Sequence, residues 1–101
     1  MNLKRQFDPI RDWANQRGII EHGDPKTQTL KMFDEAGELA RAVLADNKAE
    51  IKDGIGDIVV VLTSIAAQKG LRIEDCINYA YQQIKDRKGK LVGGNFVKNK
   101  S

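Results

Sequence analysis

Residues 50–62 read EIKDGIGDIVVVL, and this stretch constrains the fold more than any other part of the chain. Three carboxylates and two glycines lead without a break into five apolar residues, Ile58 to Leu62. Apolar residues recur every three or four positions from Ile51 to Ala66, which is typical of a helix. Residues 58–62 point in different directions around that helix, and a helix that is apolar on all sides is buried on all sides. Because a chain of 101 residues can hardly surround it, we expect a homo-oligomer, a dimer or a tetramer.

Composition and hydropathy narrow the class of protein. The chain is 41% hydrophobic and 31% charged, as expected for a single globular domain over residues 1–101. Its longest wholly apolar run, residues 58–62, is far shorter than the roughly 20 residues of a membrane helix. No apolar stretch follows Lys4 and Arg5, so we expect no secretory signal, no membrane partner and a cytoplasmic location. A single cysteine, Cys76, excludes an internal disulfide.

Cap and turn signals divide the chain into four expected helices. Two Asp-Pro pairs, at residues 8–9 and 24–25, are typical of helix starts, and Gly18 and Gly70 are typical of helix ends. A polar break at residues 46–48 separates the second from the third, and the expected helices cover residues 8–18, 24–45, 49–69 and 73–88. We therefore predict an all-α fold, a bundle-like domain of four antiparallel helices that oligomerisation completes. Residues 89–101, with Gly93-Gly94 as a flexible joint, are expected to form an irregular tail.

Positive charge gathers in that tail. From residue 85 onward the sequence holds six lysines or arginines and one acid, whereas the rest of the chain has 11 basic and 13 acidic residues. Although the net charge of the chain is +3, its body, residues 1–84, is therefore slightly acidic. A basic tail is typical of contacts with phosphate-bearing ligands or nucleic acid, and equally of a solvated chain end.

Two strips of carboxylates are expected to face each other. Glu50, Asp53 and Asp57 fall within an arc of roughly 60° on the helix over residues 49–69. The helix over residues 24–45 carries three more within about 100°, namely Asp34, Glu35 and Glu38. Helices joined by a short break usually pack antiparallel, so the strips can meet beside apolar surfaces, where carboxylates must be protonated or meet cations. Oxygen ligands without histidine or thiol suit Mg²⁺ or Mn²⁺ rather than zinc, although a solvated acidic face is the alternative.

Two glycines lie beside the second strip. Gly54 and Gly56 each cost about 1 kcal/mol relative to alanine inside a helix. We therefore expect another group to approach the backbone closely at these positions.

At these residues the sequence resembles the MazG-like, all-α nucleoside triphosphate pyrophosphohydrolases, whose signature is Glu-Glu-x-x-Glu on one helix and Glu-x-x-Asp on the next. Residues 34–38 read DEAGE and residues 54–57 read GIGD, so Gly54 stands where the signature has a glutamate. The ending GKLVGGNFVK is similar to that of small MazG-like proteins of bacteriophages. The resemblance covers nearly the whole chain. It implies Mg²⁺-dependent hydrolysis of an NTP or dNTP to a monophosphate and pyrophosphate.

The resemblance also implies roles for individual residues. The implied metal ligands are Glu35, Glu38 and Asp57, with Asp53 as the candidate fourth. Glu38 is the candidate base for the attacking water, and Asp34 and Glu50 are expected to support the ligands. The candidate substrate contacts are Lys85 and Arg87 for phosphate oxygens, Trp13 for the nucleobase, and Lys31. Lys85 and Arg87 are equally explained by the dipole of the helix that they end, Lys31 by charge balance and Trp13 by core packing.

Two other functions stay open. The first is a non-catalytic helical interaction or nucleotide-binding module, which Gly54 favours because it interrupts the acidic signature. The second is a nucleic-acid-binding protein that uses the basic tail. The second is opposed by the acidic body and by the lack of interleaved aromatic residues other than Phe96. Nothing in the sequence indicates which base or sugar is preferred.

Overall fold

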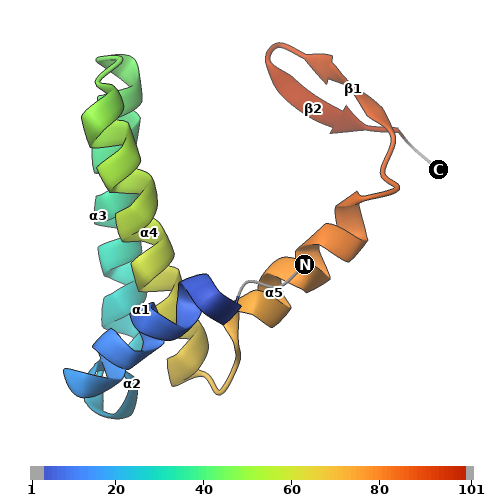
Figure 1. The fold of residues 1–101 in the computed structure, drawn as a ribbon. Helices are drawn as coiled ribbons and strands as arrows, with labels where there is room; N and C mark the ends of the chain where they lie inside the picture. Colours follow the sequence, from blue (N-terminus) through green and yellow to red (C-terminus); the bar gives the residue numbers. More distant parts are fainter. Residues whose placement is uncertain (1–3, 100–101) are drawn as a thin grey trace.

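The computed structural model describes residues 4–99 and is mostly helical, as predicted (Figure 1). The elements in chain order are α1 (Lys4–Gln16), α2 (Ile19–His22), α3 (Pro25–Leu44), α4 (Lys48–Gln68), α5 (Ile73–Ile84), β1 (Gly89–Val92) and β2 (Asn95–Lys98). The strands pair antiparallel, with Gly89 opposite Lys98 and Val92 opposite Asn95.

The centre of the fold is the antiparallel pair of α3 and α4, which share the most extensive contact in the described chain. Asp24 caps α3 as predicted, because its carboxylate accepts a hydrogen bond from the backbone N–H of Lys26 at 3.0 Å. Asn47 caps α4 in the same way by accepting from the N–H of Glu50 at 3.2 Å. The helix predicted over residues 49–69 is confirmed, although Lys48, expected in the preceding break, is already helical. These caps leave only a short turn between the two acidic helices, so their carboxylates lie on neighbouring elements.

The first helix differs from its predicted limits. Residues 4–7 are already helical, and Pro9 lies inside α1 instead of opening it. Asp8 does not act as the expected cap because it lies inside α1, where its carboxylate pairs with Arg11 one turn further along. Gly18 does end this segment, with φ at +73°, but the short α2 that follows was not predicted.

The C-terminal segment also differs from its predicted form. α5 ends at Ile84 and not at residue 88. The expectation of an irregular tail is wrong for residues 89–98, which form the β1–β2 hairpin, while residues 100–101 lie outside the described part. Gly93 and Gly94 have φ of +58° and +81°, so the glycine pair forms a tight two-residue turn that suits the twist of a hairpin.

The hydrophobic core of one chain is small. The buried apolar side chains within residues 4–99 are Phe7, Ala14, Ala42, Val61 and Ala66. Of the apolar turn at residues 58–62, only Val61 is fully buried and the rest are half-buried. Leu30, Phe33 and Leu44 are 67%, 64% and 87% exposed. Complete burial of that turn therefore stays a prediction that depends on an oligomer.

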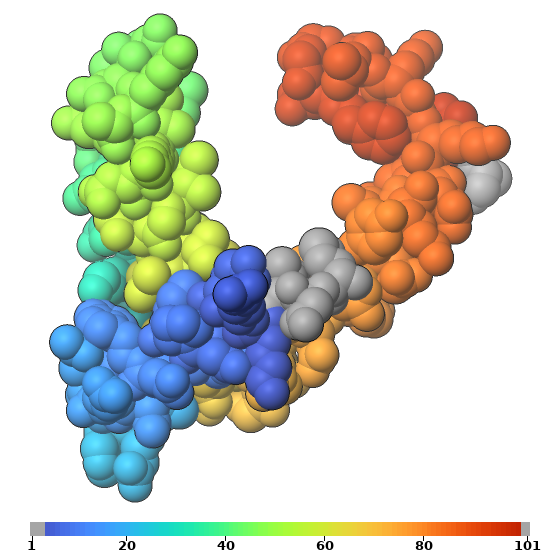
Figure 2. Space-filling view, in the orientation of Figure 1, coloured from blue at the N-terminus to red at the C-terminus, as the bar shows by residue number. Residues whose placement is uncertain are grey.

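Figure 2 shows an open, U-shaped molecule. The α3–α4 pair forms one limb, α5 and the hairpin form the other, and α1 and α2 pack near the base. The four predicted helices therefore do not close a bundle within one chain, because α5 leaves α4 at an angle of 104°. Among residues 4–99 no single helix is both long and apolar enough to cross a membrane, and α4 and α5 meet those criteria only as this bent pair.

An ion-pair network holds α5 against α1. Arg11 donates to both carboxylate oxygens of Glu74, with the second contact at 2.6 Å, and Arg72 donates to Glu74 at 3.0 Å. The side chains of Arg11 and Glu74 are only 15% and 13% exposed. The two hydrogen bonds from Arg11, opposed by partial burial, lower the pKa of Glu74 to about 2. This network therefore fixes the N-terminal end of α5, the start of the second limb, against α1.

Glu74→Gln is expected to lower the free energy of unfolding by about 2 kcal/mol at pH 7, because it removes the charged partner on α5 and leaves Arg11 paired only with Asp8 of its own helix. The pKa of Glu74 is lower in the fold than its ordinary value of 4.5, so the stabilisation is complete above pH 4.5 and disappears as the pH falls toward 2. Urea unfolding at pH 7 and pH 3 measures both effects. Asp75→Asn, at the exposed neighbouring residue, is the control and should change stability little at either pH.

Candidate functional site

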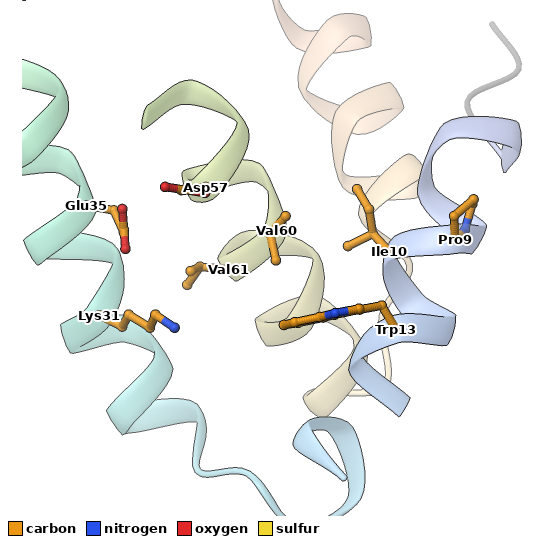
Figure 3. Close-up of a pocket in the computed structure, with 8 residues that line it drawn as sticks. All are labelled: Pro9, Ile10, Trp13, Lys31, Glu35, Asp57, Val60 and Val61. Carbon is orange, nitrogen blue, oxygen red and sulfur yellow. The ribbon is translucent and has the colours of Figure 1, made fainter. Parts of the chain in front are cut away.

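A pocket of about 480 Å³ lies between the acidic helices and α1 (Figure 3). Its walls are formed by three helices: Pro9, Ile10 and Trp13 from α1, Lys31 and Glu35 from α3, and Asp57, Val60 and Val61 from α4. Glu35 and Asp57 lie on facing sides of it, and the Lys31 side chain extends into the space between α3 and α4. The structure thus brings together four predicted site residues, of which Trp13 comes from a distant part of the sequence.

A second, smaller pocket of about 270 Å³ holds other predicted residues. It is lined by Glu38, Arg41, Glu50, Asp53 and Gly54. The two strips of carboxylates do face each other across α3 and α4, but they are divided between two pockets. Arg41, which the sequence analysis did not single out, is the cation of this second pocket. Asp34 is exposed and lines neither of the two.

Glu35 is the electrostatic focus of the first pocket. One of its carboxylate oxygens, Oε2, is buried and has no hydrogen-bond partner among the described residues. Burial raises the pKa of Glu35 above its ordinary value, the negative charges of Glu38 and Asp57 raise it further, and Lys31 opposes them. The raised pKa means that the fold disfavours the charged form of this carboxyl. Binding of a proton or of a cation would offset this effect.

The carboxylates of Glu35, Glu38 and Asp57 are the type of ligand that a hard divalent cation prefers. They do not lie close enough together to form a complete metal site. Among residues 4–99 no group of three or more acidic, histidine or cysteine side chains meets closely enough to hold a metal ion. The unpartnered oxygen of Glu35 and the mutual repulsion with Glu38 and Asp57 are nonetheless what a bound cation would resolve. Glu38 is exposed.

Gly54 explains how closely the acidic helices approach. It is buried, and a Cβ atom added there would lie 3.4 Å from both Cβ and Cδ1 of Leu39 on α3. The expected close approach is therefore right for Gly54. It is wrong for Gly56, where an added Cβ meets no described atom within 4 Å. Because even the first side-chain atom at residue 54 would contact Leu39, we expect a glutamate there to pack less well against α3 than glycine does.

The indole of Trp13 is 42% exposed at the edge of the first pocket. The guanidinium carbon of Arg17 lies 4.5 Å from the centroid of the indole ring, so the guanidinium group stacks on one face of the indole. Trp13 is therefore not a fully buried core residue. It extends from α1 toward the space beside Lys31.

The predicted phosphate-binding cations of the tail lie far from these pockets in the same chain. Lys85 directly follows α5 and Arg87 precedes β1, both on the second limb (Figure 1). Neither forms an ion pair within residues 4–99. Lys31 and Arg41 are the cations that line these two pockets.

Comparison with known proteins decides the family. The MazG nucleotide pyrophosphohydrolase domain matches residues 24–92, more than half of the chain. The chain belongs to this family. An uncharacterized 18.2 kDa protein from the rep-hol intergenic region of Haemophilus phage HP1 (strain HP1c1) is 36% identical over 67 residues, which cover 66% of this chain and 41% of that relative. No solved structure gives a significant match.

The MazG match covers the acidic helices of the site but not the wall of the pocket that α1 supplies. The match begins at Asp24, the cap of α3, and ends at Val92, the last residue of β1. Both acidic helices lie within it. The wall formed by Pro9, Ile10 and Trp13 lies outside it, so this side of the pocket is supplied by a segment that the family profile does not cover.

Proposed function

We propose that this MazG-family chain hydrolyses a nucleoside triphosphate between the α and β phosphates, giving a monophosphate and pyrophosphate. The observation that carries the proposal is Glu35. Its buried, unpartnered oxygen and the raised pKa of its carboxyl, beside Asp57 and near Glu38, support a site for a divalent cation. The adjoining pocket of about 480 Å³ offers room for a nucleotide.

Glu35, Glu38 and Asp57 would hold Mg²⁺, with Mn²⁺ as the substitute. Asp53 is the fourth acid of the set, because residue 54 is a glycine and carries no carboxylate. The bound ion would supply positive charge to the triphosphate. Asp34 and Glu50, both exposed, add negative potential around these ligands.

Other roles in the reaction belong to side chains of the protein itself. Glu38 accepts the proton of the water whose oxygen adds to the α phosphorus, and pyrophosphate leaves on the opposite side. Lys31 projects into the pocket and pairs with phosphate oxygens. Trp13 packs against the base. We place this reaction in the cytoplasm, where nucleoside triphosphates are available.

The test is an assay of purified protein with a panel of NTPs and dNTPs and Mg²⁺, in which orthophosphate is measured before and after added inorganic pyrophosphatase. The proposal predicts orthophosphate only after pyrophosphatase treatment. Orthophosphate before treatment would reject cleavage between the α and β phosphates. No turnover with any substrate would support the non-catalytic module, which the lack of a preformed three-ligand group in residues 4–99 favours.

Trp13→Ala is expected to raise KM roughly tenfold with little change in kcat, because base stacking contributes about 1–3 kcal/mol to binding and takes no part in the bond cleavage. Steady-state kinetics with the best substrate of the panel measures both constants. Trp13→Phe keeps an aromatic face and should stay within a few-fold of the wild type. A fall in kcat at unchanged KM would contradict the stacking role.

A further inference from the structure

The pocket between α1 and the acidic helices is polar on one side and apolar on the other. The carboxylates of Glu35 and Asp57 lie on one side. The other side, which α1 supplies, carries no charged side chain and consists of Pro9, Ile10 and Trp13 (Figure 3). Because a cation and the phosphates that it binds belong beside the carboxylates, the apolar side is left for the nucleobase.

One face of the Trp13 indole is already covered by another side chain. The guanidinium carbon of Arg17 lies 4.5 Å from the ring centroid, and Nη1 of Arg17 donates a hydrogen bond to the backbone carbonyl of Trp13 at 3.3 Å. Arg17 forms no ion pair within residues 4–99. A guanidinium is attracted by the negative charge on the face of an aromatic ring, so this stack restricts the rotation of the indole.

Helix geometry indicates which face Arg17 covers. Arg17 follows Trp13 by four residues, about one helical turn, whereas Pro9 precedes Trp13 by the same interval. Helical side chains lean toward the N-terminus of their helix, so Arg17 reaches back over the indole face that is turned toward the C-terminal end of α1. Pro9 and Ile10 lie on the opposite side of the ring (Figure 3). The indole face beside these two pocket residues is therefore the open one.

We infer that Arg17 is a positioning residue, which holds the Trp13 indole with one face covered so that the nucleobase stacks on the face beside Pro9 and Ile10. The inference rests on the proposed function, because it concerns the base of the same triphosphate. Arg17 acts through Trp13 and touches neither base nor phosphate. It also assigns recognition of the base to α1, a helix that precedes the MazG match at residues 24–92. Apart from the indole N–H, the α1 side of the pocket offers no side-chain hydrogen-bonding group, so the base is recognised by its ring face.

Two probes separate binding of the base from binding of the phosphates. The nucleotide α,β-methylene-ATP carries an adenine and resists the proposed cleavage, whereas inorganic tripolyphosphate carries no base. Both are titrated by calorimetry in the presence of Mg²⁺. Arg17→Ala should bind α,β-methylene-ATP about three- to fivefold more weakly than the wild type, and tripolyphosphate equally well. Arg5→Ala, which removes the same charge from an exposed residue of α1, should bind both probes as the wild type does.

A double-mutant cycle tests whether Arg17 acts through Trp13. Trp13→Ala/Arg17→Ala should bind α,β-methylene-ATP no more weakly than Trp13→Ala alone, because without the indole Arg17 has no ring to hold. Additive losses would show that Arg17 contacts the ligand directly and would overturn the inference. Arg17→Lys keeps the charge but not the planar group, so its affinity should return to within about twofold of the wild type.

The fluorescence of Trp13 reports the covered face directly, because Trp13 is the single tryptophan of the chain. In the ligand-free protein, Arg17→Ala should increase quenching by acrylamide up to about twofold, since a second face of the ring becomes accessible. Saturating α,β-methylene-ATP should protect the wild-type indole from acrylamide, and tripolyphosphate should not. Equal quenching of Arg17→Ala and the wild type, or no protection by α,β-methylene-ATP, would contradict the inference.

Failure of this inference is distinguishable from failure of the proposed function. Equal affinity of the wild type and Arg17→Ala for α,β-methylene-ATP, in a protein that releases pyrophosphate from nucleoside triphosphates, would reject the role of Arg17 alone. A protein that shows the expected effects of Arg17→Ala and Trp13→Ala on binding but hydrolyses no triphosphate would reject the proposed function alone, because both probes bind without being cleaved.

Discussion

Glu35→Gln is expected to lower the rate of nucleoside triphosphate hydrolysis by on the order of a thousandfold. Glutamine keeps the volume of the side chain but removes the negative charge that a divalent cation requires. The same change removes the repulsion with Glu38 and Asp57 that raises the pKa of Glu35. Without Mg²⁺, the variant should therefore melt at the same temperature as the wild type or higher.

Opposite effects on activity and stability make this prediction specific. Steady-state rates at saturating Mg²⁺ and thermal melting in EDTA measure the two quantities on the same preparations. Glu21→Gln, at an exposed acid on α2, is the matched control and should keep wild-type activity. Nearly wild-type turnover by Glu35→Gln, or loss of activity together with loss of helix, would contradict the role of Glu35.

The second large effect concerns Gly54, where the family signature and the packing make opposite predictions. Gly54→Glu restores the signature glutamate, but its side chain must pass Leu39, which already lies at contact distance from an added Cβ. We expect the free energy of unfolding to fall by about 2 kcal/mol and the activity to fall with it. Urea unfolding and the hydrolysis assay measure the two changes.

Gly54→Ala is the control for this prediction. Its Cβ would lie 3.4 Å from the nearest Leu39 atoms, and alanine favours the helix by about 1 kcal/mol, so stability should be unchanged or higher. In Leu39→Ala/Gly54→Glu the obstructing side chain is gone, and activity should exceed that of Gly54→Glu alone. A stable and more active Gly54→Glu would show that the glycine has no packing role.

The helices that carry the site were predictable because their signals are local. Asp24-Pro25 specifies the start of α3 through one carboxylate and one N–H, and the spacing from Ile51 to Ala66 specifies α4 without reference to other segments. The hairpin also had a local signal, the Gly93-Gly94 pair between apolar residues. A glycine pair permits either a tight turn or a flexible joint, and the prediction chose the joint.

The arrangement of the site was only partly predictable. Helical periodicity gives the direction of Glu35, Glu38 and Asp57 around each axis, but it does not give their levels along two packed helices. For this reason the sequence did not predict that the carboxylates are divided between two pockets. The third wall, with Trp13, depends on the placement of α1. That placement rests partly on the contact of Arg11 with Glu74, 63 residues away, for which the sequence carries no local signal.

The central claim is that the carboxylates of α3 and α4 jointly bind a hard divalent cation, and calorimetric titration with Mn²⁺ tests it most directly. The wild type is expected to bind the ion and to release it to EDTA. Glu35→Gln/Asp57→Asn should bind at least about tenfold more weakly, while Glu21→Gln should bind as the wild type does. Equal Mn²⁺ affinity of the wild type and Glu35→Gln/Asp57→Asn would contradict the claim.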